Sequence, residues 1–127
     1  MEHISSAAGA PKPVGPYSQA VKSSNLVFCA GQIGIDPTTS QLVQGGIEAQ
    51  VNQTLANLGA VLRACGSSPA EIVMTTIFLA AMSDGPLVNQ LYAQFVNTEA
   101  PPARQTIAVK ELPMGALIEI SVIAAAK

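Results

Sequence analysis

One arginine and one glutamate lie in segments whose residue types could form a small-molecule site. Arg104, one of two arginines in the chain, follows the stiff dipeptide Pro101-Pro102, and Glu119 lies in a later segment. A guanidinium binds a carboxylate through two parallel hydrogen bonds, a geometry that lysine cannot reproduce. A carboxylate placed nearby can hold water and accept its proton. Together the two side chains outline a small-molecule site.

Both residues belong to segments that alternate as β-strands do. Arg104 and Thr106 share one side of the first segment, and Glu119 lies opposite an apolar face of the second. That apolar face consists of Ile118, Ile120, Val122 and Ala124. Residues 110–115 form a turn between the two segments, so the strands can pair. If they do, Arg104 and Glu119 lie near each other at a sheet edge.

The remaining residues exclude several familiar kinds of site. His3, the single histidine, lies in a terminus that we expect to be mobile, so catalytic triads and multi-histidine metal sites have no structured histidine to use. The sequence has no glycine-rich nucleotide-binding motif. Cys29 and Cys65 are expected to be reduced thiols that pack as small apolar residues. Any catalysis must therefore use carboxylate, guanidinium, hydroxyl, amide and backbone groups.

The composition predicts a single domain, residues 1–127, that associates with itself. Charged residues make up 11% of the chain, against about 25% in typical domains, and apolar residues make up 49%. So few charges leave surface to be covered by other copies, most simply in a closed symmetric oligomer. A net charge of −2 without a basic cluster argues against nucleic acid as a partner. No apolar run of about 18 residues is present to cross a membrane, and the N-terminus lacks a secretion signal.

The spacing of apolar and turn residues predicts an α+β fold. Helical spacing runs through residues 47–65, before Gly66, and again along residues 86–95. Alternating or β-branched runs predict strands at residues 17–21, 26–35 with an interruption at Gly31, 41–43, 72–79, 104–109 and 117–124. The expected architecture is a two-layer sandwich, a mixed β-sheet with two helices on one face. The other face of the sheet must be covered by neighbouring subunits.

Six short segments, in order and at fitting spacing, resemble the RidA family, also called YjgF or the reactive intermediate deaminases. They are Gly-Pro-Tyr-Ser-Gln-Ala at 15–20, Ala-Gly-Gln-Ile at 30–33, Asn-Gln-Thr-Leu-Ala-Asn-Leu at 52–58, Val-Asn-Gln-Leu-Tyr at 88–92, Pro-Ala-Arg at 102–104 and Ile-Glu-Ile at 118–120. No single segment is specific, but together they cover nearly the whole chain. The resemblance implies a chorismate-mutase-like fold and a homotrimer with three clefts between adjacent subunits.

The resemblance also implies an activity. Family members hydrolyse reactive 2-imino acids, such as 2-iminopropanoate and 2-iminobutanoate (tautomers of 2-aminoacrylate and 2-aminocrotonate), to 2-keto acids and ammonia. The reaction removes metabolites that damage other enzymes. It implies small 2-imino and 2-keto acids as ligands, with no cofactor and no metal. The expected location is the cytoplasm, or an organelle if a transit peptide has been removed.

Arg104 and Glu119 match the family's signature segments, and this match implies roles for them. Arg104 would bind the substrate carboxylate, while Glu119 would hold and activate water, helped by the backbone carbonyl of Thr106. Because a protonated imine carbon is already electrophilic, no strong nucleophile is needed. The further substrate-binding residues implied are Tyr17, Gly31 and Asn89, with Gly31 approaching the ligand through its backbone.

Departures from the family pattern leave alternatives open. Gln105-Thr106 follows the arginine where the best-known members have Ser-Cys, and Ala30 and Pro101 replace a hydroxyl and a bulky residue. These changes bear on the preference for substrate side chains more than on the reaction. The same clefts could serve a non-catalytic trimer that binds small molecules or protein partners. A ribonuclease activity, sometimes ascribed to relatives, is disfavoured by the acidic charge and the scarcity of aromatic residues.

Overall fold

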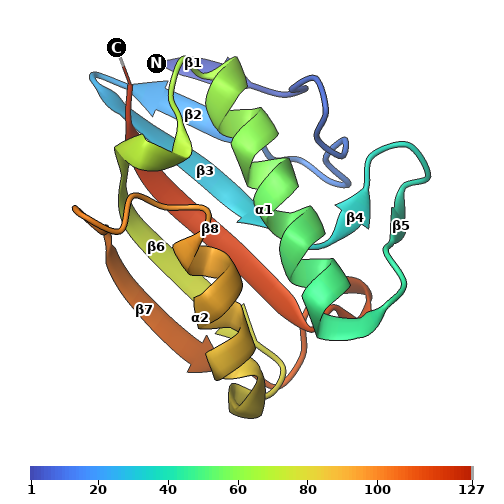
Figure 1. Ribbon diagram of the computed structural model, residues 1–127. Coiled ribbons are helices and arrows are strands. Elements are labelled where there is room, and N and C mark those ends of the chain that lie inside the picture. The colour runs from blue at the N-terminus through green and yellow to red at the C-terminus, as the bar shows by residue number, and fades with distance from the viewer. Residues whose placement is uncertain (127) are drawn as a thin grey trace.

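The computed structural model describes residues 1–126 and shows two layers, with both long helices on one face of a β-sheet (Figure 1). The helices are α1 (Gly46–Ala64) and α2 (Gly85–Ala93). The strands are β1 (Glu2–Ile4), β2 (Ala20–Ser23), β3 (Leu26–Gln32), β4 (Ile35–Asp36), β5 (Gln41–Leu42), β6 (Ile72–Leu79), β7 (Ala103–Ala108) and β8 (Ile118–Ala125). The predicted α+β class, with two helices and a mixed sheet, is confirmed.

The order of strands in the six-stranded sheet is β1-β2-β3-β8-β6-β7. β7 runs parallel to β6, while β8 runs antiparallel to both β3 and β6. The prediction that the last two strands pair with each other is therefore wrong, because β6 lies between them. The physical reason is the helix α2, which carries the chain back over the sheet and so returns β7 parallel to β6. Consequently Glu119 lies on an interior strand of the sheet.

Helix α1 forms the core together with the inner face of the sheet. Val51, Leu58 and Leu62 recur at helical spacing and are fully buried, as are Ile118 and Ile120 of β8. The predicted apolar faces of this helix and strand are thus confirmed. After Cys65, Gly66 adopts a φ of 73°, which ends the helix at the predicted place because a left-handed backbone favours glycine.

The N-terminal third differs most from the prediction. The first predicted strand lies three residues later, at β2, so Tyr17 belongs to the preceding loop. His3 lies in the unexpected strand β1, pairs with Val21, and places its Nδ1 3.3 Å from the Ser18 hydroxyl. Strands β4 and β5 form a separate two-stranded ribbon. Short, polar strands such as these carry little alternation, and only the tertiary fold defines them.

The two faces of the sheet differ in what covers them. One packs against α1 and α2, and the other carries Leu26, Phe28 and Ile107 with 39–48% of their surface exposed. Within residues 1–126 neither helix is long and apolar enough to span a membrane.

Candidate functional site

The Arg104 guanidinium points toward the helix layer and is held by two residues of α2. Its Nη1 donates a hydrogen bond to Asn89 Oδ1 at 2.7 Å, and its central carbon lies 5.2 Å from the centroid of the Tyr92 ring. The three side chains line a hollow of about 390 Å³ together with Pro101 and Pro102. Asn89 and the aromatic face fix the guanidinium in place. Arg104 is itself exposed, so the remaining N–H groups of its guanidinium can reach a ligand.

Tyr92 is a site residue that was not identified from the sequence, where it was taken as part of the buried side of α2. Its hydroxyl donates to Thr75 Oγ1 at 2.8 Å, and Thr75 pairs with Arg104 across β6 and β7. Burial raises the pKa of Tyr92, so the phenol stays neutral. Its spacing of three residues from Asn89 was the available signal, because residues three apart share one helix face.

Thr106 lies two residues after Arg104 and therefore on the same side of β7. Its hydroxyl is buried and has no hydrogen-bond partner among residues 1–126. Thr106 thus places a polar atom without a partner on the same side of the strand as the arginine.

Glu119 forms part of a second pocket, of about 480 Å³, at the end of β3. Tyr17 and Gly31 line the same pocket. A Cβ added at Gly31 would lie 2.6 Å from Glu119 Oε2, so the absence of a side chain makes room for the carboxylate. Partial burial raises the pKa of Glu119 above its ordinary value of 4.5. The pocket therefore contains a carboxyl group that is less strongly acidic than one in water.

The loop that carries Tyr17 is anchored by a buried amide. Gln19 is 1% exposed, accepts a hydrogen bond from the Ala7 N–H and donates one to the Pro11 carbonyl. These two bonds hold the N-terminal loop over the sheet, where Pro11 and Tyr17 form a wall of the pocket. Buried amides whose donors and acceptors are satisfied rigidify their surroundings.

Helix α1 anchors the opposite walls with two further amides. Asn57 Nδ2 donates to the carbonyls of Ile33 at 3.0 Å and Ile35 at 2.9 Å, and both of these residues line the pocket. Gln50 Oε1 accepts a hydrogen bond from the Leu117 N–H at 2.8 Å, just before Glu119. The helix thus positions the loops on both sides of the carboxylate.

The six predicted site residues fall into two groups on opposite faces of the sheet. The arginine half-site consists of Arg104, Thr106 and Asn89 and faces the helices. The glutamate half-site consists of Tyr17, Gly31 and Glu119. Ile118 and Ile120 point into the core, so Glu119 between them points to the other face. The expectation that strand pairing brings Arg104 and Glu119 together within one chain is therefore wrong.

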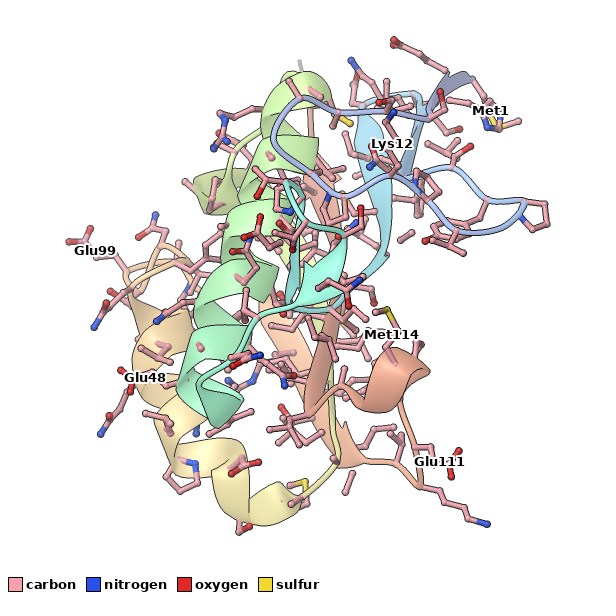
Figure 2. The ribbon with its side chains drawn as sticks, turned by 90° about the vertical axis from the view of Figure 1, so that its right-hand side faces the viewer. Met1, Lys12, Glu48, Glu99, Glu111 and Met114 are labelled. Atoms are coloured by element: carbon pink, nitrogen blue, oxygen red, sulfur yellow. The ribbon has the colours of Figure 1, made fainter. Side chains whose placement is uncertain are left out.

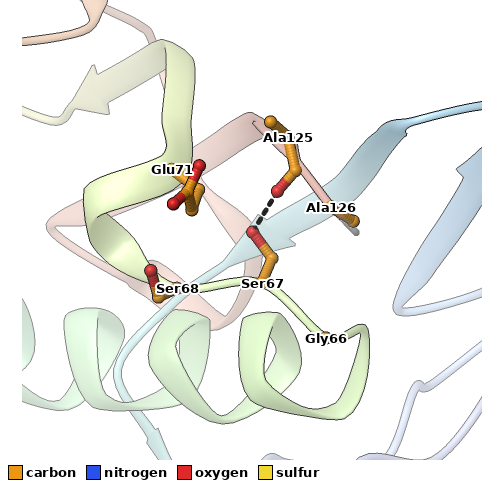
Figure 3. Close-up of a pocket in the computed structure, with 6 residues that line it drawn as sticks. All are labelled: Gly66, Ser67, Ser68, Glu71, Ala125 and Ala126. Carbon is orange, nitrogen blue, oxygen red and sulfur yellow. Dashed lines mark hydrogen bonds between the residues drawn. The ribbon is translucent and has the colours of Figure 1, made fainter.

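A third hollow, of about 240 Å³, lies at the far end of α1 and contains none of these residues (Figure 3). There the Ser67 hydroxyl donates to the carbonyl of Ala125, which ties the loop after α1 to the end of β8. Glu71 is its one charged side chain. The hollow therefore lies where the loop after α1 is joined to the end of β8, and we assign it a structural role.

Metal ligands do not gather in the described part of the chain, where no three His, Cys, Asp or Glu side chains could hold an ion. Cys29 and Cys65 are buried and free. Burial raises the pKa of Cys29 to about 12, so its thiol is unreactive at neutral pH.

Comparison with known proteins gives matches along almost the entire chain. Residues 7–126 match the family model described as Endoribonuclease L-PSP. A RutC family protein from Pyrococcus horikoshii is 44% identical over 124 residues, which make up 98% of each chain. The human 2-iminobutanoate/2-iminopropanoate deaminase is 40% identical over 124 residues, 98% of this chain and 90% of the human protein.

Solved structures agree with these matches. A candidate endoribonuclease from Thermotoga maritima has a TM-score of 0.94 and 42% identity, and the match covers 100% of this chain and 99% of that one. TdcF from E. coli, solved with bound serine, has a TM-score of 0.91 and 31% identity over 99% of this chain and 100% of its own. The chain therefore belongs to the RidA (YjgF) family.

Proposed function

We propose that this protein hydrolyses 2-imino acids to 2-keto acids and ammonia at sites that two copies of the chain form together. The observation that carries the proposal is the pair of half-sites, a held guanidinium on one face of the sheet and a half-buried carboxyl group on the other. A 2-imino acid needs both groups at once. A human relative at 40% identity is named for this reaction.

The arginine half-site supplies the substrate anchor. Arg104 binds the carboxylate through a planar pair of hydrogen bonds, while Asn89 and Tyr92 keep its fork oriented. A substrate held this way presents its C=N bond in one orientation to the neighbouring copy. Such positioning lowers the free-energy barrier, because the translational and rotational entropy of the reacting groups has already been lost on binding.

The glutamate half-site supplies the water. Glu119 in its ionised form accepts a proton as the water oxygen attacks the carbon of the protonated imine, which gives a carbinolamine. The proton then passes from Glu119 to the nitrogen. The C–N bond breaks and ammonia leaves as the C=O bond forms, while the hydroxyl proton returns to Glu119 and from there passes to the released ammonia. Glu119 has a raised pKa, which makes it a better base than an exposed glutamate.

The open face of the sheet supports the association that this site requires. Leu26, Phe28 and Ile107 form exposed apolar surface there, in a chain with only 11% charged residues. Apolar surface of this kind is typically covered in an oligomer. A closed trimer with a chorismate-mutase-like fold, which the proposal includes, would create three equivalent composite sites.

The test is release of ammonia and keto acid from imines generated in situ by a threonine dehydratase. We expect wild-type protein to accelerate release over buffer and Arg104→Ala to lose at least about a hundredfold in kcat/KM, because a charged hydrogen-bonded anchor is removed. Arg63→Ala is the matched control, since Arg63 is the other arginine and lies exposed in the last turn of α1. A wild-type rate equal to that of buffer would refute the proposal.

A non-catalytic binding function is the second candidate, and it rests on the relative TdcF with its bound serine. It predicts binding of keto or amino acids without any turnover of imines. The family model is described as an endoribonuclease, which suggests a third activity. The net charge of −2 argues against RNA as a substrate, because proteins that bind RNA usually present a basic surface.

A further inference from the structure

Met114 has a backbone conformation that methionine rarely adopts. Its φ and ψ are 58° and 20°, in the left-handed region, and its side chain is 55% exposed. The turn around it is closed by hydrogen bonds from the Gly115 N–H to the Leu112 carbonyl and from the Ala116 N–H to the Pro113 carbonyl. Strained residues of this kind concentrate at functional sites, because the surrounding structure must hold them in place.

This turn places Met114 on the glutamate half-site. Met114 and Pro113 line the same pocket as Glu119, which follows shortly after them at the start of β8. Figure 2 shows Met114 on the same side of the ribbon as Lys12, whereas Glu48 and Glu99 lie with the helices on the other side. The buried amide of Gln50 fixes the next part of the chain at Leu117. The thioether is thus held at the rim of the pocket.

The pocket is larger and more apolar than a three-carbon or four-carbon acid requires. Its volume of about 480 Å³ lies in the range of roughly 300–1,000 Å³ that accommodates much larger ligands. Its apolar lining consists of Pro11, Val14, Ala30, Ile33, Ile35, Pro113 and Met114. Methionine adapts its shape to different apolar groups because it is unbranched and polarisable.

We propose that Met114 selects 2-imino acids with extended apolar side chains, such as those derived from leucine and methionine, over the alanine-derived imine. The inference rests on the proposed function. The carboxylate of the substrate is held by Arg104 of one copy, and its side chain enters the pocket of the other copy beside Glu119. Each methylene buried against Met114 and its neighbours strengthens binding.

Charged groups around the pocket do not favour an acidic side chain instead. Lys12 and Glu119 are the one basic and the one acidic side chain of its lining, and no ion pair joins them within residues 1–126. Lys12 is exposed at the rim, where water screens it. An anionic substrate side chain would be desolvated among apolar groups with Glu119 nearby, which disfavours it.

The test compares imines that an L-amino-acid oxidase makes from alanine, leucine and glutamate. We expect wild-type kcat/KM to be roughly tenfold higher for the leucine-derived imine than for the alanine-derived one. Met114→Gly, which removes the side chain and suits the positive φ, is expected to reduce this ratio to about twofold or less. Ser40→Gly is the control, because Ser40 also has a positive φ, of 60°, and does not line the pocket.

The outcomes separate this inference from the proposed function. A wild-type ratio near one, a preference for the glutamate-derived imine, or an unchanged ratio in Met114→Gly would overturn the role of Met114. If no imine is turned over, titration calorimetry with pyruvate and 4-methyl-2-oxopentanoate still tests whether Met114 favours extended apolar side chains. Tighter binding of the branched keto acid, lost in Met114→Gly and kept in Ser40→Gly, would support the selection. Equal affinity, or no binding of either acid, would overturn it.

Discussion

Glu119 is the acidic residue of the proposed site, and its side chain is partly removed from water. Burial alone raises its pKa, and no ion pair within residues 1–126 involves it. Within one chain the ionised form is therefore disfavoured. The carboxyl group at this position therefore binds a proton more tightly than an exposed glutamate does.

The raised pKa predicts how Glu119 affects stability. An acid whose folded pKa is raised binds more protons in the folded state, so stability falls as pH rises from 4.5 through the folded pKa. Glu119→Gln removes that penalty. We expect the variant to melt at a higher temperature than wild type near pH 7, to show little difference near pH 4, and to be inactive. Thermal melts at fixed protein concentration between about pH 4 and pH 8 measure this. A variant less stable than wild type at neutral pH would contradict it.

At the same scale, the sequence indicated the residue types of the site better than their arrangement. Arg104 and Asn89 do lie in contact, and Tyr17 and Gly31 share a pocket with Glu119. Residue types are visible in the sequence, whereas the face that each one occupies depends on sheet order. Tyr92 was missed because an aromatic residue on a buried helix face is usually part of the core.

The elements that support the pocket act through backbone carbonyls. Asn57 of α1 is fully buried, and its amide is the donor for the carbonyls of Ile33 and Ile35, while Gln53 donates to Asn57 Oδ1 at 2.9 Å. The carbonyls belong to Ile33, between β3 and β4, and to Ile35, the first residue of β4, and both residues line the pocket. Helix α1 therefore holds this wall of the pocket in place through the side chain of Asn57.

Asn57→Leu tests this connection. Leucine has a similar volume but removes the Asn57 donor from both carbonyls, and the Ile33 carbonyl keeps the hydrogen bond from the Ile35 N–H. A buried carbonyl left without a donor costs about 1–3 kcal/mol. We expect the free energy of unfolding to fall by about 2 kcal/mol or more, and KM for an imine to rise because the wall loosens. Denaturant unfolding and steady-state kinetics measure the two effects. Gln53→Ala is the control, since Gln53 contacts Asn57 alone in this network. A variant as stable as wild type would refute the role of Asn57.

The elements also show where sequence reasoning reached its limit. Helix α1 was predicted within about one residue at each end because apolar spacing and Gly66 both mark it. The order of the strands in the sheet was not predicted, because the residue patterns of β6, β7 and β8 are compatible with several different neighbouring strands. The crossover through α2 decides between those neighbours, and its effect is visible only once β7 is known to lie parallel to β6.

The whole molecule presents two incomplete sites and one open apolar face. Arg104 faces the helix side of an edge strand, and Glu119 faces away from the helices on an interior strand. No hinge or loop movement within one chain brings them together, because the sheet lies between them. A second copy can do so by covering the open face and presenting its own Arg104 to Glu119. The architecture thus accounts for both the exposed apolar side chains and the divided site.

This arrangement predicts that two inactive variants restore activity when mixed. In the proposed trimer each site would take Arg104 from one copy and Glu119 from the next. Random mixing of Arg104→Ala with Glu119→Gln would then leave roughly one quarter of the sites with both native residues. We expect imine hydrolysis at about that fraction of the wild-type rate after the two variants are co-expressed or refolded together. Each variant alone, treated identically, is the control.

Native mass spectrometry of tagged copies establishes whether mixed oligomers have formed. An absence of imine hydrolysis can then not be attributed to a failure of the two variants to mix. Mixed oligomers without activity would show that Arg104 and Glu119 do not act at one site built from two copies. Restored activity requires the two residues to come from different chains, since no single chain in the mixture carries both. The experiment therefore connects the separation of the two half-sites within one chain directly to the proposed chemistry.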